Sequence, residues 1–289
     1  MTELVPGYTV VEHLNRARTY DIYDVWSEER ACRCVAKALR PDVDRDRSAR
    51  RALVREGRLL CRLTHPHLVR GYEVVSSPGT VVIMETLSGE TLAHLIDTGD
   101  PLSASELAYL GLQLCSAVGY LHRHDVLHLD LKPSNIVADA GRAKIIDLGV
   151  ARRPGRAPGG VGTWCYMAPE QVRGGVLGPA ADVWGIGVVL WEAAAGRAAF
   201  GGDEDGVPAS GDMEKLPPDL HPQVRRPAEP VGRYRKLPRV LARAIDTALS
   251  PEPDARPSLD ELAVLLEHVP GVMSPRDRPP ASDAEIASA

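Results

Sequence analysis

Residues 128–135 carry the strongest signal in the chain, reading His128-Leu129-Asp130-Leu131-Lys132-Pro133-Ser134-Asn135, with Asp147-Leu148-Gly149 beginning twelve residues after Asn135. A divalent cation on a polyphosphate takes hard oxygen ligands, which Asn135 and Asp147 supply. Asp130 can orient an acceptor hydroxyl and take its proton, and Lys132 can balance the charge that develops on a transferred phosphoryl group. The pattern therefore indicates phosphoryl transfer. The alternative, that Asp130, Asn135 and Asp147 are unrelated polar residues of loops, is disfavoured.

The sequence before this stretch is rich in predicted strands. Residues 8–39 predict short strands, and within them a period of two puts Val35, Lys37 and Leu39 on one face. Residues 46–63 predict an amphipathic helix. Two further strands, separated by a Ser-Ser-Pro-Gly turn, are predicted over residues 68–75 and 80–85.

From Leu87 onward the apolar period becomes helical. A capping box, Ser103-x-x-Glu106, opens one helix, and a second, Ser258-x-x-Glu261, opens a last helix that runs through Leu266. The apolar run Val183–Trp191 is far shorter than the roughly twenty residues of a membrane span, so it predicts a buried segment. Strands followed by helices predict an α+β fold with two lobes. Residues 201–235, rich in Gly, Pro and Asp, predict a long irregular connection.

These motifs, with Ala168-Pro169-Glu170 further on, resemble the Hanks-type protein kinases, and among them the bacterial serine/threonine kinases. The resemblance covers roughly residues 7–268 and rests on several motifs in the family's order. It implies a bilobal fold with a small strand-rich lobe that contains one helix and a larger, mainly helical lobe. The implied division is residues 1–88 for the N-terminal lobe, with a hinge at 85–88, residues 89–269 for the C-terminal lobe, and residues 270–289 for a flexible tail.

The resemblance also implies a role for each matching residue. Lys37 would hold the α- and β-phosphates of ATP, and Glu56 would pair with its ammonium. Asp130 would be the catalytic base, and Lys132 would contact the γ-phosphate. The ligands of Mg²⁺ would be Asn135 and Asp147. The gatekeeper, the hinge and the apolar walls of the adenine slot would be Met84, Glu85, Leu87, Leu14, Ile22, Val35 and Val137.

Three supporting roles follow from the same resemblance. Thr163 would bond Asp130 and Lys132, although an autophosphorylation site is an equal alternative for this hydroxyl. Residues Glu170 and Arg256 would form a structural ion pair. Asp182 would begin the buried helix that anchors the catalytic loop. His128 is interpreted as a packing residue rather than a base, because the neighbouring carboxylate already has that role.

The loop that covers the phosphates departs from the family's G-x-G-x-x-G-x-V pattern. Aligned from Leu14, its three glycine positions hold Asn15, Ala17 and Tyr20. Because glycine permits positive φ and a close approach of the backbone to phosphates, we expect weakened nucleotide binding.

The segment after Asp147 also departs from the family. Leu129 stands where many relatives have the arginine that pairs with an activation-loop phosphate, and residues 148–162 contain no Ser, Thr or Tyr. We therefore expect this loop to be ordered without phosphorylation.

Two functions remain open at this point. The first is an active, ATP- and Mg²⁺-dependent serine/threonine protein kinase. The second is a nucleotide-binding pseudokinase acting as a scaffold or sensor, which the missing loop glycines favour. A small-molecule phosphotransferase is disfavoured by Lys132-Pro133 and Ala168-Pro169-Glu170, which resemble the machinery for protein substrates.

The composition narrows the partners. The formal net charge is -5, which offers no broad cationic surface for nucleic acid, so the expected partner is a protein substrate. The five cysteines have no metal-ligand spacing and indicate free thiols in a reducing cytosol. The N-terminal residues lack a secretory signal pattern, and no stretch is long enough to span a membrane, so we expect a cytoplasmic protein. The Arg-, Ala-, Gly- and Pro-rich composition suggests a bacterial source.

Overall fold

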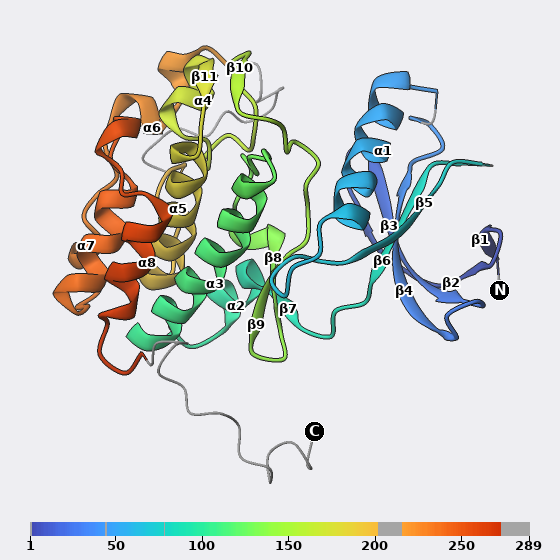
Figure 1. The fold of residues 1–289 in the computed structure, drawn as a ribbon, viewed down its shortest axis with the longest axis horizontal. Coiled ribbons are helices and arrows are strands. Elements are labelled where there is room, and N and C mark those ends of the chain that lie inside the picture. The colour runs from blue at the N-terminus through green and yellow to red at the C-terminus, as the bar shows by residue number, and fades with distance from the viewer. Residues whose placement is uncertain (1, 44, 78, 202–215, 273–289) are drawn as a thin grey trace, which may run out of the picture.

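The computed structural model describes residues 2–43, 45–77, 79–201 and 216–272. Its N-terminal part is built on a six-stranded antiparallel sheet in the order β1-β2-β3-β4-β6-β5 (Figure 1). These strands are β1 (Glu3–Val5), β2 (Tyr8–Arg16), β3 (Tyr20–Ser27), β4 (Cys32–Leu39), β5 (Gly71–Val75) and β6 (Val81–Glu85).

One helix, α1 (Arg47–Arg62), packs on this sheet. It begins at Asp46, whose carboxylate accepts hydrogen bonds from the first free backbone N–H groups of the helix. Gly57 lets the helix approach closely, because a Cβ at this position would lie 2.6 Å from a methyl carbon of Val82. The close approach brings the adjacent Glu56 into the interior, where it is fully buried.

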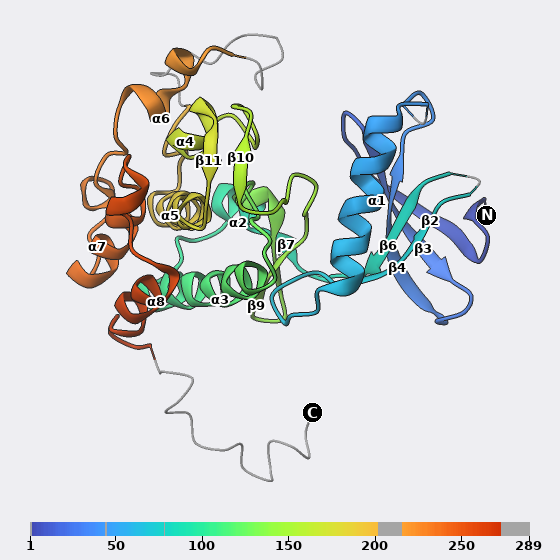
Figure 2. The same ribbon diagram turned by 45° about the horizontal axis from the view of Figure 1, so that its top comes forward.

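The C-terminal part is mainly helical and is built around a single buried helix. Its α-helices are α2 (Leu92–Thr98), α3 (Ala104–Arg123), α4 (Pro169–Arg173), α5 (Ala180–Ala195), α6 (Pro222–Arg225), α7 (Arg239–Ala248) and α8 (Leu259–Glu267). Every residue of α5 from Ala181 to Ala194 is buried. Figure 2 shows α5 nearly end-on, with α3 and α7 beside it. The buried segment predicted from the apolar run is therefore the core of this part of the molecule.

A small sheet lies where the two parts meet. Its order is β7-β8-β9, and a separate pair, β10-β11, lies further along the chain. The five strands are β7 (Glu90–Thr91), β8 (Ile136–Asp139), β9 (Arg142–Ile145), β10 (Gly155–Ala157) and β11 (Gly175–Leu177). The connection from β6 is fixed against β8, because the backbone N–H and the hydroxyl of Ser88 donate to Asp139 Oδ1 at 3.0 and 2.9 Å. A side chain at Gly89 would overlap the carbonyl oxygen of Ala138, so this crossing requires glycine.

The predicted α+β class is confirmed, and so are both capping boxes. Ser103 N donates to Glu106 Oε2 at 2.7 Å and Glu106 N donates to Ser103 Oγ at 3.2 Å, and Ser258 and Glu261 pair in the same way.

Some boundaries differ from the prediction. The strand expected from residue 68 begins at Gly71, because Leu68 forms a parallel bridge with Ile145 instead. The strands β1, β7–β11 were not predicted. Residues 216–235 are not wholly irregular, since they contain the short helix α6 and two 3₁₀ turns, Pro218–Leu220 and Val231–Arg233. The remainder of the expected connection, residues 202–215, and most of the predicted tail, residues 273–289, lie outside the described residues.

The buried carboxyl group of Glu192 on α5 generates a prediction about stability and pH. It accepts a hydrogen bond from the Tyr166 hydroxyl at 3.2 Å, but burial raises its pKa to about 7 from an ordinary value of 4.5. Between these two pH values the unfolded chain loses the proton while the folded chain keeps it, so the free energy of unfolding falls as pH rises. Because glutamine cannot ionise, the free energy of unfolding of Glu192→Gln should not fall in this way as pH rises.

The expected result is that the unfolding free energy of Glu192→Gln, relative to wild type, rises by about 2 kcal/mol between pH 5 and pH 8. Chemical denaturation at both pH values measures it. Glu252→Gln, which changes an exposed carboxylate, is the control and should show no such rise. A difference independent of pH for Glu192→Gln would contradict the prediction.

Candidate active site

Three elements converge on the ammonium group of Lys37. Lys37 lies on β4, and its Nζ donates to Glu56 Oε1 and Oε2, on α1, at 2.8 and 2.9 Å. It also donates to Asp147 Oδ2 at 3.0 Å, two residues beyond the end of β9. Lys37 is only 6% exposed, so one buried cation connects the sheet and its helix to the C-terminal part of the molecule.

Burial and mutual attraction set the charges of this cluster. Burial opposes the charge of Lys37, but the carboxylates of Asp147 and Glu56 outweigh it and raise the pKa of the ammonium. Burial also works against ionisation of Asp147, yet the Lys37 ammonium and the Gly149 N–H hold its pKa below the ordinary value. For Glu56, burial and the charge of Asp147 raise the pKa above its ordinary value, although the Lys37 ammonium opposes this shift. Lys37 and Asp147 therefore remain charged at neutral pH.

A second cluster surrounds Asp130. The Thr163 hydroxyl donates to Asp130 Oδ1 at 2.6 Å, and Lys132 Nζ donates to the same hydroxyl oxygen at 2.6 Å. Lys132 Nζ also lies 3.0 Å from Asp130 Oδ2. Asn135 Nδ2 donates to the backbone oxygen and to Oδ2 of Asp130 at 3.0 and 3.1 Å. Because the amide nitrogen of Asn135 is used in this way, its amide oxygen is the atom available to a cation.

Asp182, in the first turn of α5, anchors the loop that carries Asp130. The buried carboxylate of Asp182 accepts hydrogen bonds from the backbone N–H groups of His128 and Leu129 at 2.9 and 2.7 Å. It also pairs with His122 Nε2 at 2.7 Å, a role for His122 that its place at a helix end did not reveal. Leu129 has φ +65, a conformation that costs an L residue about 1–2 kcal/mol. The two backbone hydrogen bonds to Asp182 offset this cost.

Two further expectations concern neighbouring residues. The expected ion pair is formed, with Arg256 donating to both carboxylate oxygens of Glu170 at 2.6 and 2.8 Å. His128 is 1% exposed, and its Nδ1 accepts a hydrogen bond from Asp130 N at 3.1 Å. Its ring therefore faces the interior and helps to shape the loop.

A cleft lies between the sheet and the C-terminal part, and both clusters open into it. Six of the residues expected in the adenine slot line this cleft, namely Ile22, Val35, Met84, Glu85, Leu87 and Val137. Lys37, Lys132, Asn135 and Asp147 line it as well. The cleft is also lined by Asn15, Ala17 and Tyr20 of the loop expected over the phosphates, and by Gly89 beside the expected hinge. Val69, Ser134 and Ile146 line it as well and were not expected there.

Leu14 is the exception among the expected residues. It is absent from the described lining of the cleft, and 49% of it is exposed. The register of β2 against β3 shifts between His13 and Asn15, so that Asn15 and not Leu14 lies opposite Ile22. Directly opposed residues share a face of the sheet, so this bulge brings Asn15 to the cleft in place of Leu14. A period of two alone does not predict such a bulge.

The missed residues differ in the signal they offered. Ile146 immediately precedes Asp147, and this position in the sequence was the only signal that it could line the cleft. Val69 offered no local signal, because its place at the cleft depends on a residue far away in the sequence. Its backbone N–H donates to Ile145 O at 2.8 Å.

The donor set of the cleft fits a magnesium ion that is bound together with phosphates. Asp147 supplies a carboxylate and Asn135 an amide oxygen, and Mg²⁺ commonly takes one or two protein ligands and completes its shell with phosphate oxygens and water. Within residues 2–43, 45–77, 79–201 and 216–272, no group of three or more His, Cys, Asp or Glu side chains could hold a metal ion by itself. Among the same residues, no helix has both the length and the apolar character needed to cross a membrane.

Comparison with known proteins agrees with this geometry. The family model described as the protein kinase domain matches residues 8–268. The serine/threonine-protein kinase PknB of Mycobacterium tuberculosis is 30% identical over 272 residues, which cover 84% of this chain and 44% of PknB. The serine/threonine-protein kinase PkaA of Streptomyces coelicolor is 32% identical over 237 residues, which cover 78% of this chain and 41% of PkaA. The chain thus spans about two-fifths of the length of these relatives.

The anchor at Asp182 yields a prediction that does not depend on any activity. In Asp182→Asn the amide nitrogen of the new side chain would face an N–H donor, and one buried backbone group would lose its acceptor. We expect the free energy of unfolding to fall by about 2–4 kcal/mol, measured by chemical denaturation.

Asp254→Asn, at an exposed position, is the matched control and should change stability by less than about 0.5 kcal/mol. If Asp182→Asn proved as stable as this control, Asp182 would not be the anchor of the loop.

Proposed function

The chain belongs to the protein kinase family, and on that premise we propose that it is a serine/threonine protein kinase, which transfers the γ-phosphoryl group of ATP to a hydroxyl of a protein substrate. Use of ATP and Mg²⁺ is general in this family. The observation that supports the proposal most directly is the simultaneous contact of Lys37 Nζ with Glu56 and Asp147, at 2.8 and 3.0 Å. With these contacts made, a cation for the phosphates and a carboxylate for the metal face one cleft.

Binding of the nucleotide would use both parts of the molecule. The adenine would lie between Val35 and Val137, and its edge would meet the backbone of the connection at residues 85–88, where we place the boundary between the lobes. Lys37 would contact the α- and β-phosphates. Asn135 and Asp147 would hold Mg²⁺, which neutralises charge on the phosphates when bound.

Transfer of the phosphoryl group would take place at Asp130. The Thr163 hydroxyl donates to Asp130 Oδ1, which indicates that this carboxylate accepts a hydrogen bond from a hydroxyl at this position. A substrate hydroxyl that approaches Asp130 would be oriented in the same manner and would lose its proton to the carboxylate. Lys132, whose Nζ lies 3.0 Å from Asp130 Oδ2, would stabilise the negative charge on the γ-phosphoryl group.

The pseudokinase alternative is favoured by one feature, the loop between β2 and β3. The centre of the Tyr20 ring lies 4.7 Å from Lys37 Nζ. The ring thus covers the ammonium group that would contact the phosphates. The turn is a tight hairpin, closed by the hydrogen bond from Ala17 N to Tyr20 O at 2.8 Å. Arg40 clamps it by donating to the carbonyl oxygens of Ala17 and Arg18, each at 3.3 Å.

We infer that this loop weakens nucleotide binding without removing the chemistry. The hairpin replaces a glycine-rich backbone that could approach the phosphates. It leaves the arrangement of Asp130, Asn135 and Asp147 in place, and these residues perform the transfer. We therefore favour an active kinase of low affinity for ATP over a scaffold.

Removal of the metal ligand tests the activity directly. Asp147→Asn should lower transfer from labelled ATP, with magnesium and a generic basic protein, by at least about a thousandfold, because the charge that holds the metal is lost. Lys37→Met should lower it by about a hundredfold or more.

Asp254→Asn should retain the wild-type rate, since this residue is exposed and distant in the chain from the cleft motifs. Thermal melting shows whether each variant is folded. Full activity in a folded Asp147→Asn protein would overturn the proposed function.

The effect of Tyr20 is tested by two substitutions at that position. Tyr20→Gly removes the ring from Lys37 and should tighten ATP binding about fivefold, since the lost cation–π contact is worth about 1 kcal/mol. Tyr20→Phe keeps the ring and should bind ATP as the wild type does. Isothermal titration with ATP and magnesium measures both, and weaker binding by Tyr20→Gly would show that the ring supports the nucleotide.

We infer that contacts within the chain order the segment after Asp147. Leu127 and Arg152 exchange two backbone hydrogen bonds of 2.7 and 3.0 Å, and β10 pairs with β11. Gln171 Nε2 donates to the carbonyl oxygens of Leu129 and Val161 at 2.8 and 2.7 Å. These contacts support the proposal that the segment needs neither the arginine nor the phosphate that many relatives use.

We therefore expect phosphatase treatment to leave the transfer rate within about twofold of the untreated protein, because no charge that orders the segment is removed. The comparison uses the same protein preparation before and after treatment. A large loss of activity would show that phosphorylation outside residues 148–162 orders the segment.

A further inference from the structure

The outward side of α1 is strongly basic. Six of its sixteen residues are arginines, namely Arg47, Arg50, Arg51, Arg55, Arg58 and Arg62, and we call these the arginine face. The only acidic residue of the helix, Glu56, is buried against Lys37 on the opposite side. This concentration of positive charge stands on a chain whose net charge is -5, so it is a local feature and not a consequence of composition.

Most of the arginine face is uncompensated. The side chains of four arginines are exposed and make no ion pair or hydrogen bond with any residue that the structure describes, namely Arg47, Arg51, Arg58 and Arg62. Arg55 donates to the carbonyl oxygen of Gly149 at 3.2 Å, which carries no net charge. Like charges three and four residues apart destabilise a helix by a few tenths of a kcal/mol per pair. A ligand of opposite charge would relieve this repulsion.

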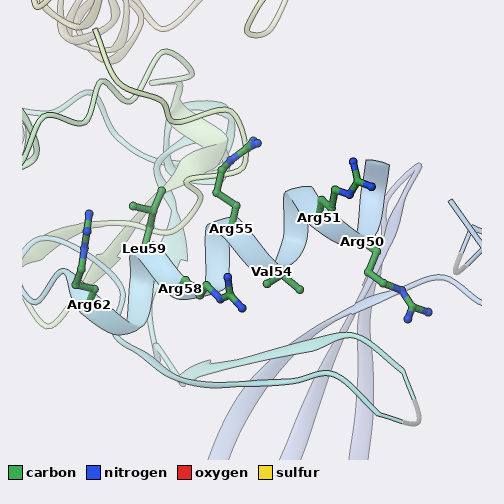
Figure 3. A pocket seen from close by; sticks show the side chains of 7 residues that line it. All are labelled: Arg50, Arg51, Val54, Arg55, Arg58, Leu59 and Arg62. Carbon is green, nitrogen blue, oxygen red and sulfur yellow. The ribbon is translucent and has the colours of Figure 1, made fainter. Parts of the chain in front are cut away.

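The arginine face also has an apolar component. A surface hollow runs along α1 and is lined by five of the arginines together with Val54 and Leu59. Figure 3 shows these seven side chains along the helix, with the two apolar residues between the arginines. Val54 and Leu59 are partly exposed, although the other apolar residues at the centre of the helix, Leu53 and Leu60, are fully buried. The hollow therefore combines carboxylate-binding groups with a small apolar contact.

We propose that the arginine face is a docking site for an acidic, amphipathic segment of another protein. The face extends over fifteen residue steps, about 22 Å of helix, which matches roughly four turns of a bound helix. Aspartate and glutamate side chains of that segment would pair with the guanidinium groups, which bind carboxylates with two parallel hydrogen bonds. Leucine-type side chains three or four residues apart would contact Val54 and Leu59.

The same features disfavour other polyanions. Helix α1 contains no aromatic residue on which bases could stack, and the remainder of the chain is acidic and would repel an extended nucleic acid. An anionic membrane surface would require a wider apolar face than two partly exposed side chains. The proposal concerns binding alone, and it holds whether or not the chain transfers phosphate.

The test uses a fluorescently labelled sixteen-residue helical peptide with glutamates on one face and leucines three or four residues apart, titrated with the protein and followed by anisotropy. Arg51→Glu/Arg58→Glu reverses two exposed charges of the arginine face. Arg239→Glu/Arg243→Glu reverses two exposed charges on α7 and is the matched control. We expect the first variant to weaken binding about tenfold or more, the control to leave it unchanged, and higher salt to weaken it for the wild type.

A scrambled peptide of the same composition should bind more weakly than the designed one, because its leucines no longer meet the hollow. Equal loss in both charge-reversal variants, equal binding of the scrambled peptide, or no binding at low salt would overturn the proposal. It would also be overturned if duplex DNA or phosphatidylserine vesicles bound more tightly than the peptide and lost that binding in Arg51→Glu/Arg58→Glu. Thermal melting of each variant confirms that the compared proteins are folded.

Discussion

The structure depends on the charge of one buried lysine. An ammonium group can be buried only if carboxylates surround it, and those of Lys37 come from α1 and from the segment that follows β9. The pairing sets the position of the helix on the sheet and of the sheet relative to the rest of the molecule. It also places a cation and a carboxylate at the same cleft. The stability of the arrangement and its chemistry are therefore consequences of the same electrostatic requirement.

A second buried charge performs the equivalent task in the helical part. Asp182 is completely surrounded by protein and satisfies backbone groups of a loop that would otherwise be strained at Leu129. Asp182 belongs to α5, the most deeply buried of the described helices. The loop is therefore anchored to the core and not to the surface. This arrangement fixes the position of Asp130, which the proposed role of its carboxylate as a general base requires.

At two places where we propose that the chain departs from its family, the structure shows contacts within the chain. The loop between β2 and β3 is a hairpin, and Arg40 donates to two carbonyl oxygens of its turn. Backbone pairing and the Gln171 side chain contact the segment after Asp147, whose residues 148–162 contain no Ser, Thr or Tyr. The residues that we propose as catalytic are thus held by contacts within the protein itself. On the exposed side of α1, four side chains of the arginine face make no ion pair with any residue that the structure describes.

By itself the sequence determined the features that depend on neighbours along the chain. Capping boxes, the buried apolar run and the order of strands before helices follow from local periodicity, and the spacing of Asp130, Asn135 and Asp147 identified the chemistry. Only the tertiary structure decided which side chains meet across long separations. It brought Tyr20 into contact with Lys37 and His122 into contact with Asp182. It also placed Val69 at the cleft, and a bulge in β2 turned Asn15 instead of Leu14 toward the cleft. The physical reason is that such contacts are fixed by how elements pack and register against one another, which no local pattern encodes.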